Sequence, residues 1–132
     1  MTISSPYSTI KIYPEDRLLH STWLEESKQL KEDQVMQEML QVSRLVVQHQ
    51  VQLILADVIH YPFRENTTLQ NWINNQYIPD ILDSGIKRYA IVVKEMVMSN
   101  LDNLEDLIDK EDSMELRYFT DSDEAKKWLI SQ

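Results

Sequence analysis

The pattern of apolar and polar positions predicts strands that alternate with helices. Residues 53–56 and 90–93 are two uninterrupted apolar runs, which are typical of parallel strands covered on both faces. The second run follows Gly85, the only glycine of the chain. Glycine accepts a positive φ, so we expect it to end one helix and release the chain into the next strand. We therefore place a strand at residues 87–93 in the middle of a parallel sheet.

The N-terminal part predicts an antiparallel hairpin. Residues 10–13 alternate apolar and polar, Pro14 opens a turn, and residues 18–24 return as a second strand. Residues 1–8 are polar, and we expect them to be loosely held. Further strands are predicted at residues 51–58 and 114–119.

Much of the remaining sequence has apolar residues spaced three and four positions apart, which predicts helices. Residues 32–49 carry one broad apolar face that includes Val47. Further helices are expected at residues 67–84, where Pro79 must kink or restart the helix, at residues 100–108, and at residues 121–129. The fold class is α/β: one domain over residues 1–132, with a mixed, mostly parallel sheet of four to five strands, the hairpin, and about four helices.

Charge and composition narrow the partners. The chain has 132 residues, a net charge of -9, 42% hydrophobic residues and no cysteine. This balance disfavours nucleic acid and anionic membranes, which need clustered Lys and Arg. No apolar run approaches the ~20 residues that span a bilayer, so we expect no membrane insertion. We expect a cytoplasmic protein without a cofactor.

The loop after the strand at residues 51–58 is the first candidate site, because ligands and partners meet open α/β sheets at the carboxyl ends of strands. Asp57 ends that strand, and either contributes to a site or caps the loop by accepting backbone N–H groups. Asn66, Thr67 or Thr68 is expected to cap the next helix. The segment at residues 94–99 completes the expected surface. The candidate binding residues are Asp57, His60, Tyr61, Phe63, Arg64, Thr67, Thr68 and Met96.

The residue types and their spacing give little support for a catalytic or metal-binding site. His20 reads as a packed or surface strand residue. Asp57 and His60 are a conceivable acid–base pair, and with His20 or His49 a conceivable metal set, but the spacing fixes no distance. The acidic positions at residues 102–112 fit a solvated helix face. We expect neither a catalytic residue nor a metal site, because no nucleophile elbow, phosphate loop or HExxH helix is present.

The chain resembles a known fold family over residues 10–130. The segments that carry the likeness are residues 53–57, Trp72 with residues 78–79, residues 85–92, residues 117–119, and Ala125 with residues 128–129. In order and spacing they resemble the STAS domains of bacterial anti-sigma-factor antagonists and anion transporters. They resemble more closely the small bacterial STAS-like proteins grouped near the lipid-binding CRAL-TRIO fold.

This resemblance implies a non-catalytic regulatory or interaction module that binds a protein partner or a second copy of itself. We expect Tyr61, Phe63 and Trp72 to be exposed for such contact. In the antagonists, a kinase phosphorylates a helix-opening serine in an Asp-Ser motif that precedes a glycine. Residues 65–69 lack that motif but carry hydroxyl groups at a helix start, so Thr67 and Thr68 are the candidate phosphosites, with simple N-capping as the alternative. The alternative is a carrier or sensor of a small apolar or lipid-like ligand.

Overall fold

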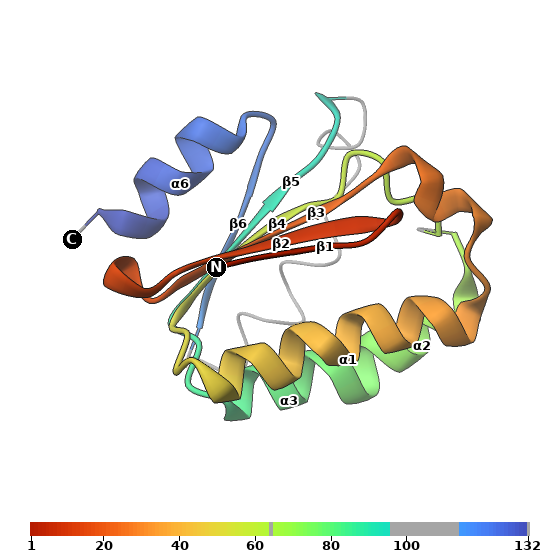
Figure 1. Cartoon of the computed structure of the whole chain (residues 1–132), viewed down its shortest axis with the longest axis horizontal. Helices are drawn as coiled ribbons and strands as arrows, with labels where there is room; N and C mark the ends of the chain where they lie inside the picture. The colour runs from red at the N-terminus through yellow and green to blue at the C-terminus, as the bar shows by residue number, and fades with distance from the viewer. Residues whose placement is uncertain (64, 96–113, 132) are drawn as a thin grey trace.

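The computed structural model describes residues 1–63, 65–95 and 114–131. A sheet lies between two helical layers, with α1, α2 and α3 on one face and α6 on the other (Figure 1). The strands are β1 (Thr2–Ser4), β2 (Ser8–Tyr13), β3 (Leu18–Trp23), β4 (Leu53–Asp57), β5 (Arg88–Val92) and β6 (Glu115–Phe119). The helices are α1 (Glu32–Gln48), α2 (Thr67–Trp72), α3 (Ile78–Asp83) and α6 (Ser122–Ile130), with short helical turns η1 (Pro14–Asp16), η2 (Glu25–Gln29) and η3 (Ile73–Tyr77).

The strands lie in the sheet in the order of the sequence, β1-β2-β3-β4-β5-β6. The β1–β2 and β2–β3 pairs are antiparallel, and the three remaining pairs are parallel. This confirms the α/β class, the hairpin and the parallel remainder. The expected count of four to five strands is wrong, because the sheet has six.

The additional strand is β1, inside the segment expected to be loosely held. Thr2 lies opposite Lys11 and Ser4 opposite Thr9, while Ile3 packs against the main core. A three-residue strand with one apolar side chain is too short to show an alternating pattern. Backbone pairing with β2, which the sequence alone does not display, holds these residues in place.

The environment of β5 is as predicted. Gly85 follows Ser84, the C-cap of α3, and has φ +89, a left-handed conformation that an L-residue adopts only with strain. Tyr89 and Ile91 belong to the core beneath α1 and α3, whereas Ala90 and Val92 belong to the core beneath α6. Both faces of β5 are therefore covered.

The helical segment from α2 to α3 passes through a π-helical stretch at η3. Pro79, the second residue of α3, lacks an N–H and its ring would clash with the carbonyl four residues earlier. The wider π turns just before it accommodate this, so the interruption expected at Pro79 takes the form of a π stretch. The helix expected at residues 100–108 lies outside the described residues.

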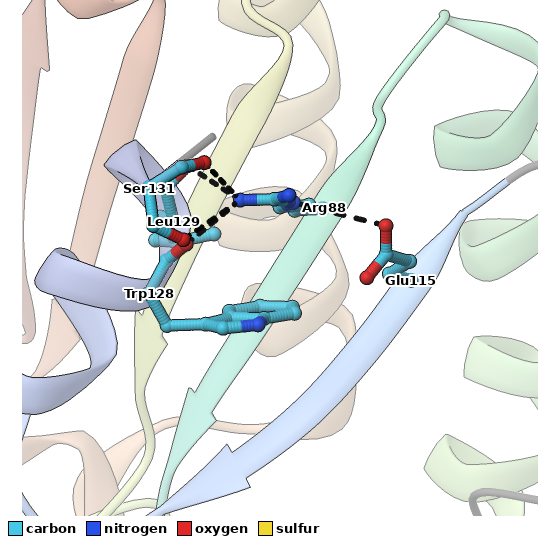
Figure 2. Close-up of polar contacts among 5 residues, drawn as sticks. All are labelled: Arg88, Glu115, Trp128, Leu129 and Ser131. Atoms are coloured by element: carbon cyan, nitrogen blue, oxygen red, sulfur yellow. Dashed lines mark hydrogen bonds and ion pairs between the residues drawn. The ribbon is translucent and has the colours of Figure 1, made fainter.

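Arg88 fixes the C-terminal helix to the sheet (Figure 2). Its Nη1 donates to the carbonyl of Trp128 at 2.8 Å and also to the carbonyl of Ser131. Its guanidinium carbon lies 5.5 Å from the centroid of the Trp128 ring, and its Nε is 3.8 Å from Glu115. One side chain from β5 thus satisfies carbonyls that the helix end leaves without intrahelical partners.

Candidate functional site

Polar groups of the loop after β4 form hydrogen bonds that hold the loop in place. Asp57 Oδ1 accepts the backbone N–H of Ile59 at 3.2 Å, which matches the loop-capping alternative. His60 is exposed, and its carbonyl accepts the Ser27 hydroxyl at 3.5 Å. No hydrogen bond joins Asp57 to His60 among the described contacts. Arg64 and Met96 lie outside the described residues.

The aromatic residues of this loop turn inward. Tyr61 packs between Trp23, with ring centroids 5.2 Å apart, and Phe63, at 5.7 Å. Trp72 stacks on Tyr77 at 6.0 Å. The expectation that Tyr61, Phe63 and Trp72 are exposed is therefore wrong: all three are half-buried. They belong to clusters that close the core.

The Tyr61 hydroxyl is buried and has no hydrogen-bond partner within the described part of the chain. Burial raises the pKa of Tyr61 to about 12, since a phenolate is poorly solvated at this position.

Asn66 is the cap of α2. Its Oδ1 accepts the N–H of Leu69 at 2.9 Å, and its Nδ2 donates to Glu32 at 3.1 Å, which ties the starts of α2 and α1 together. Thr67 and Thr68 are exposed in the first turn of α2 and do not act as its cap. Both side chains are therefore accessible at the start of a helix. Phosphorylation at either position stays a prediction.

A second group of polar side chains lies on the sheet face that carries α6. Helix α6 packs mainly on β4, β5 and β6. On this face of the sheet, β2 and β3 therefore extend beyond the helix. Strand alternation puts Thr9 and Lys11 of β2, His20 and Thr22 of β3, and Asp57 of β4 on that side. We call these five residues the open face.

Register brings the open-face residues together in pairs. Lys11 lies directly opposite His20, Thr9 opposite Thr22, and Thr22 opposite Asp57. The Thr22 hydroxyl is 3.4 Å from His20 Nε2. Lys126 of α6 flanks the group, with its Nζ 4.2 Å from the centroid of the Tyr13 ring.

The pKa of His20 is lowered, first by burial of the imidazole, and the effect of burial is opposed by the Asp57 carboxylate. The ammonium groups of Lys11 and Lys126 lower it further. The imidazole is therefore neutral at pH 7, with one nitrogen available as an acceptor and the other as a donor. Of this group, only Asp57 was among the candidate binding residues of the sequence analysis, because the members come together only through strand register.

A third candidate site is a cavity of about 60 Å³ between the sheet and α1. It exists because small side chains meet there: Ser21 of β3 lies opposite Ala56 of β4, and Ser8 of β2 is close by. Its polar lining also includes Glu38, Tyr77 and Tyr89. Ser8 donates to Glu38 Oε2 at 3.0 Å.

Tyr77 and Tyr89 are both buried in this core, line the cavity, and influence each other's titration. The pKa of each is raised, mainly by burial. Tyr77 is the last residue of the π stretch η3, and π-helical turns are frequent at functional sites. The sequence analysis missed this pair, because the two residues are 12 positions apart and lie on different elements, η3 and β5.

Residues 1–63, 65–95 and 114–131 show neither a metal-binding cluster nor a membrane-spanning helix. No group of three or more His, Cys, Asp or Glu side chains there is arranged to hold a metal ion. None of the helices in those ranges has both the length and the apolarity to cross a bilayer. Comparisons with protein-family models, curated proteins and solved structures found no match.

Proposed function

We propose that the protein is a non-catalytic interaction module that binds a protein partner through the open face. The observation that carries the proposal is the position of α6, which covers β4 to β6 and leaves polar side chains of β2 and β3 beside it. Strands hold side chains more rigidly than loops do, which reduces the ordering cost of recognition. The STAS resemblance suggests the same class of function.

The charges of the open face suggest an acidic contact segment on the partner. Lys11 and Lys126 have no carboxylate within salt-bridge distance in the described part of the chain, although the chain as a whole carries a net charge of -9. Asp57, the acidic member of the face, already accepts a backbone N–H. Two ammonium groups and the Thr9 hydroxyl then remain to bind carboxylates, beside the His20–Thr22 contact.

Binding is favoured over catalysis by the geometry around His20. Thr22, His20 and Asp57 are the types of residue found in a nucleophile, base and orienting acid. The Thr22–His20 contact of 3.4 Å is long, and Asp57 accepts a hydrogen bond from its own loop, with none to the imidazole among the described residues. The trio lacks the two linked hydrogen bonds that activate a nucleophile.

A lipid-like ligand finds less support. Pockets for drug-sized ligands measure roughly 300 to 1,000 Å³. The cavity beneath the sheet, at about 60 Å³, is far smaller than such a pocket.

Affinity capture from the native cell tests the proposal with charge-matched variants. The double substitution Lys11→Glu/Lys126→Glu reverses the basic flank of the open face. The control Lys28→Glu/Arg44→Glu changes net charge equally at two exposed positions on η2 and α1. We expect wild type and control to retain a common partner and the open-face variant to lose it. A partner that the open-face variant retains would refute the proposal.

A further inference from the structure

The cavity beneath the sheet contains hydrogen-bonding groups that the protein itself leaves partly unused. Ser21 is buried, at 9% exposure, and no hydrogen bond of its hydroxyl is found among the described residues. Tyr77 and Tyr89 both line the cavity, and of their two hydroxyl protons a bond between them can use only one. The other proton needs an acceptor, because an unsatisfied buried donor costs free energy.

Glu38, in contrast, has hydrogen-bond acceptors that need a donor. Its Oε2 accepts the Ser8 hydroxyl at 3.0 Å, and its carboxylate has further lone pairs at the cavity wall. A matching occupant must therefore accept a proton from the tyrosine pair and donate one toward Glu38 or Ser21. A carboxylate ligand cannot donate and would be repelled by Glu38, and an ammonium ion cannot accept.

Hydroxyl compounds meet both requirements. The volume of about 60 Å³ is room for roughly two water molecules, or for a small alcohol. We propose that the cavity is a binding site for small neutral hydroxyl compounds, occupied by water in the free protein, with the tyrosine pair, Ser21 and Glu38 as its hydrogen-bonding groups. This site lies on the opposite side of the sheet from the open face and does not depend on the proposed function.

Two substitutions remove the space without touching the tyrosine pair. Ser21→Val and Ala56→Val each add bulk to the cavity from a different strand, so one remains informative where the other fails to fold. Thr9→Val is the matched control, since Thr9 lies on β2 on the other face of the sheet.

Magnetic relaxation dispersion of labelled water counts long-lived internal waters, and ¹³C-methanol provides a probe alcohol. We expect the filled variants to lose about two long-lived waters relative to wild type, with no loss in Thr9→Val. We also expect nuclear Overhauser contacts from methanol to the Met39 methyl, which lines the cavity, in wild type and not in the filled variants. Equal water counts in wild type and both filled variants, or methanol contacts that survive the filling, would overturn the proposal.

Discussion

The guanidinium of Arg88 both donates to the main-chain carbonyl of Trp128 and lies over the indole ring of the same residue. A strand residue thereby caps the end of α6 and packs against its last turn (Figure 2). Among the described residues, α6 is the one helix on this face of the sheet. The Arg88 contact therefore determines how well α6 covers the core around Ala90 and Leu129.

Replacing Arg88 by Lys keeps the charge and removes the planar group that reaches several oxygens at once. We expect a loss of about 1 to 2 kcal/mol in the free energy of unfolding, since hydrogen bonds from charged groups are each worth about 1.5 to 3 kcal/mol. Urea denaturation followed by tryptophan fluorescence measures it. Arg44→Lys, at an exposed position of α1, is the control, and an Arg88→Lys variant as stable as that control would contradict the capping role.

Gly85→Ala tests the backbone at the end of α3. No heavy atom lies within 4 Å of an added Cβ, so only the φ of +89 opposes the substitution. We expect a loss of about 1 to 2 kcal/mol from the left-handed conformation alone, again by urea denaturation. Ser84→Ala, which removes a hydroxyl bound within the same helix, should cost less. Equal stability of Gly85→Ala and wild type would show that the turn has another conformation.

Asn66→Ala tests the assignment of the α2 cap. Removing a side-chain cap costs about 1 kcal/mol, and the bond to Glu32 is lost with it. Thr67→Ala and Thr68→Ala, one and two positions later, should leave the unfolding free energy within about 0.5 kcal/mol of wild type. The reverse ranking in chemical denaturation would assign the cap to a threonine.

His20 makes the stability of the fold depend on pH. Its pKa in the folded protein is lowered below 6.5, mainly by burial, so the unfolded chain binds the proton more readily. The stability contribution is present above pH 6.5 and is lost as the pH falls through the lowered folded-state pKa. Urea denaturation between pH 7.5 and 5 should show a smaller loss for His20→Gln than for wild type. His60→Gln, at an exposed position, should behave as wild type; an unchanged slope in His20→Gln would refute the assignment.

Much of the fold could be predicted because local patterns decide it. The apolar runs of β4 and β5 and the glycine between α3 and β5 are visible in the sequence and are confirmed. Local patterns fail where a tertiary contact decides. Val47 sits in an apolar run of α1, yet it is 66% exposed because α1 turns that side away from the sheet.

The sites were harder to predict for the same reason. Tyr61 and Phe63 follow a strand end in a polar loop, a position typical of a binding surface, but Trp23 of β3 draws them into the core. The open face and the cavity depend on which residues stand opposite each other across β2, β3 and β4. Strand register of that kind leaves no local trace in the sequence.

The most direct test of the open face is an NMR titration of the ¹⁵N-labelled protein with the captured partner. We expect the largest amide shifts at residues 9–11 of β2 and 20–22 of β3, together with residues around Lys126, and a reduced affinity in the Lys11→Glu/Lys126→Glu variant. Shifts confined to residues 58–66, or to the outer side of α1, would contradict the proposed interaction surface.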